Sequence, residues 1–372
     1  MMASTMMKHT VGPLALLLLA SACDTDGDID GDNDGGTVIF RDGDGGNGTW
    51  GTGKLNTNFL GEDGTYPLNS IPLSDDPNAE VRLHAVWATK CIGSGGGVVE
   101  GLFYTSDLNG ELGIRVAEGK LLPATFRKWG DEAELCTVEG DLWVNTVWGI
   151  VTPHEEDPEK TTDHYMMLLD QSQDPLGEPT YKWGFFTGTE PEPFNPKWYK
   201  PTCAEDLAPF GSEAYAFRFH SYLIDGLEVD EATGNFSYGA KSVNVACTSG
   251  AIGKSISWGY TPWVWGEDVH ELGTRITRAD YCGSGKSYTK EGNRLQLRDD
   301  FGINTYAEAE LQDEAAWELE LGRATCVTLP RDHELREGFQ GIACDIDGVA
   351  VTLPSCDHDE LVAAEITTKV GD

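Results

Sequence analysis

Eight cysteines between residues 91 and 356 constrain the fold of this chain more than any other sequence feature. No two of them have the C-x-x-C spacing of a zinc ribbon or a thioredoxin-like site, so structural disulfides are their expected role. An even number of cysteines in an oxidising compartment implies up to four disulfides, and the sequence leaves their connectivity open. The eight are Cys91, Cys136, Cys203, Cys247, Cys282, Cys326, Cys344 and Cys356.

The N-terminal segment predicts export to such a compartment. Lys8 precedes a short hydrophobic run, and small residues lead directly into Cys23. The run is too short to span a bilayer and is typical of a lipoprotein signal peptide over residues 1–22, after which the cysteine carries acyl chains. The alternative is ordinary cleavage after Ala22 with a free Cys23, because Ala20 stands where leucine is usual. We expect an extracytoplasmic protein that is lipid-anchored to the bacterial cell envelope, at the outer membrane or the cell surface.

The charge balance limits the partners of the chain. It has 26 basic and 62 acidic residues and a formal net charge of −36. Nucleic acid binding rests on basic patches, so nucleic acid is not an expected partner. The same charge disfavours docking on anionic lipid and leaves the acyl chains at Cys23 as the membrane attachment. With 372 residues, 40% of them hydrophobic, the chain can form two globular domains.

Residues 23–49 form an acidic Asp/Gly segment that we expect to be a flexible linker, because it holds too little apolar surface to offset the entropy of ordering. Two stretches match the opening of an EF-hand loop, starting at Asp26 and at Asp30. Their twelfth positions are Thr37 and Arg41 in place of the bidentate glutamate. Weak calcium binding is the alternative to a solvated linker.

Residues 50–205 have the pattern of a β-rich domain. Short runs of β-branched and aromatic residues are separated by Gly- and Asn-rich turns, which predicts an antiparallel sandwich or barrel. The predicted strands are 81–87, 98–104, 142–151, 165–169 and 181–186. A proline-rich segment over 190–201 predicts the end of this domain.

Residues 206–372 form a second predicted domain, of the α+β class with strands prevailing. Helical spacing of apolar residues runs from Val269 to Ala279. The predicted strands are 215–224, 242–247, 294–298 and 317–321, and in the last one Trp317, Leu319 and Leu321 share a face. The whole chain is therefore predicted to be mostly β with some α.

No catalytic motif assembles in the sequence. Two phosphate-loop look-alikes at Lys254 and Lys286 lack the required first glycine, so both are read as turns with a solvated lysine. The polar clusters at 154–157 and 357–360 lack zinc-hydrolase spacing and are read as solvated loops. We therefore expect no metal, no cofactor and no identifiable catalytic residue.

Cys282 could act as a nucleophile with His270 or His220 as its base. In an oxidising compartment with seven other mature cysteines, a disulfide is the expected state of Cys282.

The densest aromatic cluster holds Trp258, Trp263 and Trp265. Tryptophans of disulfide-stapled β-rich domains usually belong to the core, which is the favoured interpretation of these side chains. The alternative is a surface platform, for which they are candidate binding aromatics for a sugar or a peptide.

The run Ala279, Asp280, Tyr281 and Cys282, followed by Gly283-Ser284-Gly285, resembles the signature of the bacterial ADYC domain. The likeness extends upstream to Gly250–Lys254 and Trp258–Trp263 and downstream to Asp300–Ile303, and it covers roughly 206–360. The family consists largely of exported, often lipid-anchored bacterial proteins of unknown activity, so the resemblance implies disulfides and an extracytoplasmic location but no catalytic residue.

The resemblance also implies a disulfide pairing. Many family members carry two further cysteines, at the positions of Ser255 and Gly273, and their joint absence here suggests that these two positions bridge each other in relatives. Neighbouring pairing of the remaining cysteines then predicts Cys91–Cys136, Cys203–Cys247, Cys282–Cys326 and Cys344–Cys356.

Together these features predict a lipid-anchored, disulfide-stabilised cell-envelope protein that acts as a binding or structural module, with an envelope protein or a glycan as its partner. The alternative is a secreted hydrolase that acts on envelope or extracellular polymers, with residues that converge only in the fold.

Overall fold

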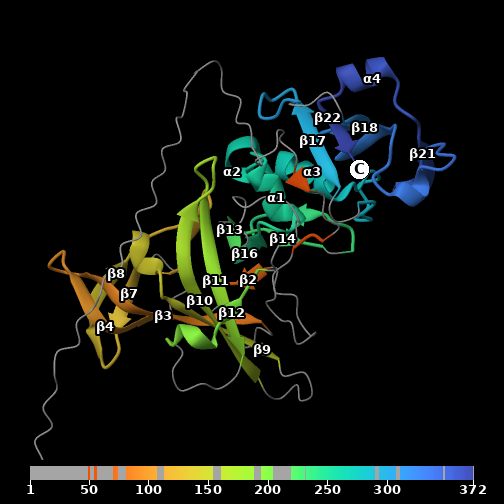
Figure 1. Ribbon diagram of the computed structural model, residues 1–372. Coiled ribbons are helices and arrows are strands. Elements are labelled where there is room, and N and C mark those ends of the chain that lie inside the picture. The colour runs from red at the N-terminus through yellow and green to blue at the C-terminus, as the bar shows by residue number, and fades with distance from the viewer. Residues whose placement is uncertain are drawn as a thin grey trace, which may run out of the picture. The chain divides into compact units, whose positions relative to one another are not determined.

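The computed structural model describes residues 49–50, 54–56, 70–73, 81–106, 113–153, 161–187, 194–203, 219–230, 232–289, 293–306, 311–346 and 348–371. The predicted signal peptide, Cys23 and most of the predicted linker lie outside the described residues. Strands prevail over helices, as expected from the sequence (Figure 1). Among the described helices, none is long and apolar enough to cross a membrane.

The larger sheet is antiparallel and has the strand order β2-β16-β13-β11-β10-β9-β3-β4-β7-β8, with β12 beside β11. Alternation of buried and more exposed side chains along β3 and β4 gives these strands one core face, whereas β13 and β16 are buried on both faces. Its strands are β2 (Ser70–Pro72), β3 (Arg82–Gly93), β4 (Val98–Thr105), β7 (Ala124–Lys128), β8 (Asp131–Val138), β9 (Val147–Pro153), β10 (Thr161–Gln173), β11 (Pro179–Thr187), β12 (Lys200–Pro201), β13 (His220–Asp225) and β16 (Ser242–Cys247).

One end of this sheet closes into a small barrel. Strand β8 pairs with β7 and also returns to β3, so that β3, β4, β7 and β8 form a closed set. The disulfide Cys91–Cys136 joins β3 to β8 close to the place where they pair. Closure removes the free sheet edge at this end.

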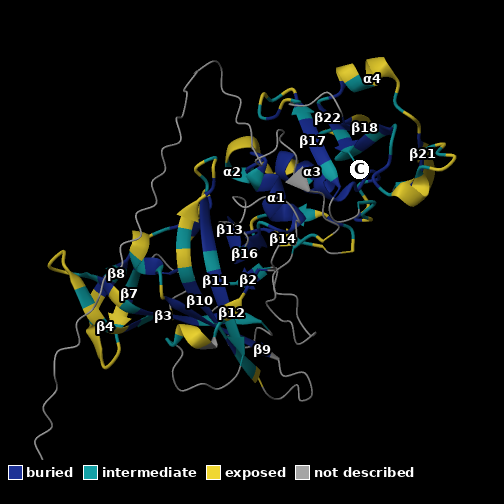
Figure 2. Ribbon diagram, viewed as in Figure 1, coloured by how far each residue is buried: buried dark blue, intermediate teal, exposed yellow. Residues whose placement is uncertain are grey.

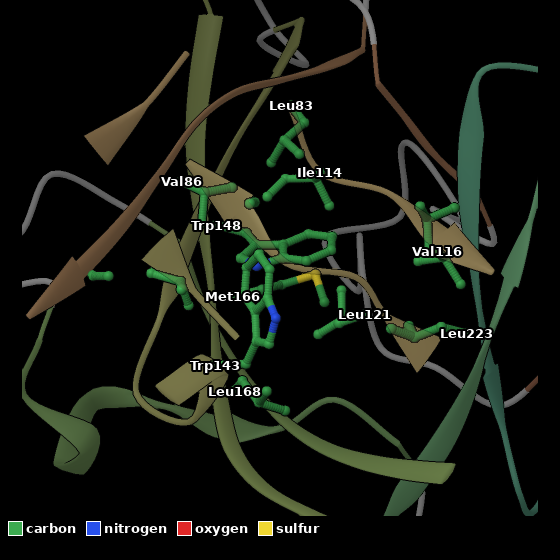
Figure 3. Packing of buried hydrophobic residues seen from close by; sticks show 14 of the residues in the cluster. Leu83, Val86, Ile114, Val116, Leu121, Trp143, Trp148, Met166, Leu168 and Leu223 are labelled. Carbon is green, nitrogen blue, oxygen red and sulfur yellow. The ribbon is translucent and has the colours of Figure 1, made fainter. Parts of the chain in front are cut away.

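The core of the larger sheet is built around tryptophans (Figure 3). Trp148 and Trp183 meet edge to face with ring centroids 4.9 Å apart. Met166 packs beside Trp148, and Leu121 and Ile114 close the cluster from a segment outside the sheet. Burial of this many large rings stabilises the part of the sheet around Trp148 and Trp183.

The smaller sheet has five strands in the order β1-β17-β22-β18-β19. Its strands are β1 (Thr49–Trp50), β17 (Arg294–Asp299), β18 (Gln312–Glu318), β19 (Arg323–Val327) and β22 (Ile366–Gly371). The helices α1 (Ala251–Ser257) and α3 (Glu267–Arg278) pack against each other, and residues of α3 share a core with the smaller sheet. Trp317 and Ile276 are both fully buried in that core.

The remaining elements are short and connect or flank the sheets. They are the strand pairs β5 (Val116–Ala117) with β6 (Lys120–Leu121), β14 (Glu228–Val229) with β15 (Phe236–Ser237) and β20 (Ile342–Ile346) with β21 (Val349–Leu353), the helices α2 (Pro262–Trp265) and α4 (His358–Ala363), and the 3-10 turns η1 (Gly140–Trp143), η2 (Pro196–Trp198) and η4 (His333–Leu335).

Strands from both sides of residue 205 share the larger sheet. Strand β13 pairs with β11 through Tyr181 opposite Ser221, and β16 pairs with β2 at the sheet end. The predicted division into domains 50–205 and 206–372 stays a prediction, and the two segments are joined by a continuous ladder of strands.

All eight of the predicted cysteines form disulfides, and two of the four predicted pairs are confirmed, namely Cys91–Cys136 and Cys203–Cys247. The other two pairs are wrong. The structure has Cys282–Cys344 and Cys326–Cys356, because β20 returns Cys344 to the end of α3 while β19 faces the segment before α4. Adjacency along the chain does not reveal this exchange.

Three local predictions are also wrong. Of the strand predicted over 142–151, the first residues belong to η1 and a turn, and β9 begins only at Val147. The strand predicted over 317–321 ends at Glu318, and Leu321 lies in a turn with 44% of its surface exposed. The segment at Lys254 is helix α1, in which the lysine is buried, since Gly253 allows the helix to approach the carbonyl oxygen of Cys247. Lys286 is exposed, as predicted, in the irregular segment that follows the bend at 283–285.

Candidate ligand-binding site

The signature residues 279–282 are buried and end helix α3. Ala279 adopts the left-handed conformation with a φ of 52°, and the Asp280 carboxylate accepts hydrogen bonds from the backbone N–H groups of Ser284 and Gly285 at 3.0 and 2.7 Å. Burial raises the pKa of Asp280, and these hydrogen bonds and Arg275 oppose the rise. A side chain at Gly285 would collide with the backbone at Thr233, so this turn requires glycine. The motif is therefore a structural cap.

Tyr281 belongs to a fully buried polar cluster. Its hydroxyl donates to Glu314 at 2.7 Å and accepts from the backbone N–H of Arg331 at 3.0 Å. The Arg331 guanidinium binds both carboxylate oxygens of Glu314, at 2.6 and 3.1 Å. Arg331 also donates to the carbonyl oxygen of Thr277 at 2.9 Å, which ties α3 to β18.

Cys282 forms a disulfide with Cys344, so it has no free thiol to act as a nucleophile. His270 is fully buried, and burial lowers its pKa to about 4. Its Nε2 lies 3.1 Å from the Ile252 carbonyl oxygen, which can only accept, so Nδ1 accepts from the Tyr238 hydroxyl at 2.8 Å. His220 is also buried, beside Thr180. Both histidines thus make buried structural contacts.

The three predicted binding aromatics do not form one surface. Trp258 is 2% exposed and belongs to the core, because its segment packs under α3 and the smaller sheet. Trp263 is partly buried against Gly119, and Trp265 is 40% exposed beside Phe301. Trp258 is therefore a core residue, as the favoured interpretation predicted, and its role as a surface binding aromatic is wrong. Trp263 and Trp265 form no shared platform with it.

A different set of aromatic side chains does line up, on the face of the larger sheet opposite its core. We call it the aromatic face, and it consists of Tyr199, Phe186, Tyr165, Trp87, Tyr104 and Trp129.

Successive rings of the aromatic face are neighbours. Ring centroids lie 6.3 Å apart from Tyr199 to Phe186, from Phe186 to Tyr165 and from Tyr165 to Trp87. Trp87 and Tyr104 are directly opposite each other on β3 and β4, and Trp129 lies 5.5 Å beyond Tyr104. The first five side chains are partly exposed and Trp129 is 63% exposed. Figure 2 shows exposed residues along β4 and β8, and Arg127 is the exposed residue of β7.

Two strand glycines leave room for rings of this face to pack against the backbone. A β-carbon at Gly149 would lie 2.6 Å from the Trp87 ring, and one at Gly184 would lie 2.6 Å from Tyr199. Glycine inside a strand normally weakens it, and here it lets a neighbouring ring lie close to the backbone. The rings are thus held by the sheet rather than by mobile loops.

Three polar side chains flank the middle of the aromatic row, on the same strands as Trp87 and Tyr165. Arg82 and Asp163 both lie opposite Val151 in the strand register, so they share a face, with β9 between them. A β-bulge at His84 turns its Nε2 to within 2.6 Å of the β-carbon position at Gly149. Burial lowers the pKa of His84, the Asp163 charge raises it, and Arg82 lowers it. The described residues include no hydrogen-bond or ion-pair partner for Arg82 or Asp163.

This arrangement offers flat apolar rings together with a donor and an acceptor that have no partner among the described residues. Such a surface can stack against a ring-shaped ligand and hydrogen-bond its polar edge. Within the described residues no group of three or more His, Cys, Asp or Glu side chains could hold a metal ion. Asp357 and Glu360 cap α4 through reciprocal hydrogen bonds of 2.8 Å, and the cluster at 154–157 lies outside the described residues.

The sequence analysis missed the aromatic face because its members come from segments far apart in the chain. The available signal was one aromatic in each predicted strand, at Trp87, Tyr104, Tyr165 and Phe186. Strand order and register, which bring them together, were needed to see the row.

The fold and the four disulfides define a mostly β, disulfide-stabilised protein of the extracytoplasmic kind. Residues 188–333 match the model of the ADYC domain, and the chain is therefore an ADYC domain-containing protein. Comparison with curated proteins gives no match, and comparison with solved structures gives none either. Most of the aromatic face lies before the matched residues.

Proposed function

We propose that this protein is a lipid-anchored, cell-envelope binding module that binds a glycan chain along the aromatic face. The observation that carries the proposal is the row of six partly or largely exposed rings, which runs from Tyr199 after η2 over β11, β10, β3 and β4 to Trp129 after β7. Exposed aromatic rows of this size are uncommon on a surface that contacts only water.

A glycan fits the face better than a peptide or a purely apolar ligand. Sugar rings have one apolar C–H face and a rim of hydroxyl groups that both donate and accept hydrogen bonds. Trp87 and Tyr165 supply the stacking surface, while Arg82 supplies donors and Asp163 supplies acceptors beside them. The mixed sign of these two charges suits hydroxyl groups.

Binding is tested by affinity electrophoresis of the full chain in gels that contain soluble polysaccharides. We expect Trp87→Ala to weaken retardation about tenfold or more, since loss of one stacking ring costs on the order of 1–3 kcal/mol. Trp265→Ala is the matched control, because it removes an exposed tryptophan outside the aromatic face. Trp87→Phe keeps a ring over Gly149, guards against misfolding and should retain most of the binding. Equal binding by Trp87→Ala and Trp265→Ala would contradict the proposal.

The lipid anchor is supported by the sequence before Cys23 and by the four disulfides, which fit an exported chain. Acyl chains at Cys23 would be the membrane attachment. Cys23→Ala should move the protein from the membrane fraction to the soluble fraction, whereas Ser21→Ala should leave it in place. Membrane association that persists in Cys23→Ala would refute the anchor.

A secreted hydrolase is the second candidate function, and the position of His84 and Asp163 beside the middle of the aromatic row is the observation in its favour. Hydrolysis would release new reducing ends from a bound polysaccharide. His84→Gln should then abolish release while binding persists. Binding without any release by the unaltered chain would leave the binding module as the function.

A further inference from the structure

The charges on the aromatic face restrict the class of glycan that it can bind, an inference that rests on the proposed function. The cations of the aromatic face are the groups that could bind a charged ligand. Two arginines lie on this face, the partly buried Arg82 and the exposed Arg127, and neither has an ion-pair partner among the described residues.

Arg127 continues the row at its barrel end. It lies directly opposite Tyr104 on β4 and opposite Leu135 on β8, so its side chain shares their face. Arg127 is exposed, and its charge acts on the Tyr104 hydroxyl, which itself binds Glu132 at 3.1 Å. The described residues include no hydrogen-bond or ion-pair partner for Arg127.

Neighbouring cations of the same strands are already neutralised. Lys90 on β3 pairs with Glu100 at 3.4 Å, and Lys128 on β7 pairs with Glu134 at 2.7 Å. Lys90 and Lys128 are thus paired, so Arg82 and Arg127 are the cations on these strands that are available to a ligand. Both arginines lie near rings of the row. Arg82 is close to His84, on the strand that carries Trp87, and Arg127 lies opposite Tyr104.

We propose that the aromatic face selects an anionic glycan, whose carboxylate or sulfate groups bind Arg82 and Arg127 while its sugar rings stack on Trp87, Tyr104 and Tyr165. The planar guanidinium group offers a fork of donors that matches both carboxylate and sulfate oxygens. Asp163 lies between the two arginines and the end of the row that holds Phe186. Its carboxylate favours hydroxyl groups of the ligand at this position. The anionic groups of the ligand are therefore expected only along the rest of the row.

Two matched pairs of polymers test this selection with the full chain. Polygalacturonate and its methyl ester share a backbone and differ in the carboxylate charge, and dextran sulfate and dextran differ in the sulfate charge. We expect the chain to bind one charged member about tenfold more tightly than its neutral counterpart at low salt, and the preference to shrink as ionic strength rises. The pair that shows the preference identifies the anionic group.

Arg82→Gln and Arg127→Gln should each weaken binding of the charged polymer about fivefold and leave binding of the neutral polymer unchanged, as expected for the loss of one exposed charge contact. Lys90→Gln is the charge-matched control and should change neither. Equal affinity for charged and neutral members in both pairs would overturn the anionic selection while the glycan-binding function stands. Absence of binding to all four polymers, with Trp87→Ala indistinguishable from the unaltered chain, would overturn both.

Discussion

Ser255 on α1 and Gly273 on α3 lie in direct contact, so that a β-carbon on Gly273 would be only 2.3 Å from the Ser255 hydroxyl oxygen. The same hydroxyl donates to the carbonyl oxygen of His270 at 3.0 Å. These are the two positions at which the family resemblance implies a further disulfide in relatives. The contact between α1 and α3 therefore offers a site for a fifth bridge.

The double variant Ser255→Cys and Gly273→Cys should form this bridge and leave the four native disulfides intact. Disulfides need β-carbons about 3.5–4.5 Å apart, which a small movement of the two helices supplies. The Tyr260 ring, 2.7 Å from the same β-carbon position, must move as well. Non-reducing peptide mapping would detect the new cross-link. Two free thiols in the folded variant would contradict the prediction, and Gly273→Ala alone should destabilise the chain by about 1–3 kcal/mol through overpacking.

Glu314→Gln should lower the free energy of unfolding by about 3 kcal/mol, because it leaves the fully buried Arg331 charge without its counter-ion. Chemical denaturation measures this change. Glu318→Gln is the control on the same strand, where a partly exposed carboxylate should change stability by about 0.5 kcal/mol or less. A Glu314→Gln variant as stable as the control would show that this cluster does not hold α3 to β18.

Stability should fall between pH 6.5 and pH 4 because of His270. Its pKa is about 4 when folded and 6.5 in its ordinary state, so the unfolded chain binds the extra proton across this window. The contribution is complete above pH 6.5 and amounts to about 3 kcal/mol lost by pH 4. His270→Gln should flatten this part of the pH profile of unfolding, measured as the difference from the unaltered chain. If the difference in unfolding free energy between His270→Gln and the unaltered chain stayed constant from pH 6.5 to pH 4, the neutral state of the buried His270 imidazole would be contradicted.

The fold class could be predicted from the sequence because alternation of apolar residues is a local signal. The strand predicted at 242–247 coincides with β16, and helical spacing from Val269 located α3. The wrong disulfide pairs and the burial of Trp258 depend on how β20 and α3 come together, which no local pattern encodes. Lys254 was misread because the packing partner of Gly253 is the distant carbonyl group of Cys247.

The candidate site was predictable only in its parts. Trp87 and Tyr165 each stand in a predicted strand, but the register of β3, β9 and β10 brings them within 6.3 Å. The bulge that exposes His84 beside Gly149 is likewise a feature of strand pairing. Charge composition pointed away from arginine-mediated recognition because Arg82 and Arg127 are a small fraction of the total charge.

The dependence of affinity on ligand length tests the central claim most directly. Isothermal titration of the full chain with an oligosaccharide series, taken from the polymer that it retards most strongly, should show affinity rising with each added sugar until the ligand spans the row from Tyr199 to Trp129. Trp129→Ala should shorten the length at which affinity stops rising. A single sugar that binds as tightly as the longest oligosaccharide, or a plateau that Trp129→Ala leaves unmoved, would contradict binding along the aromatic face.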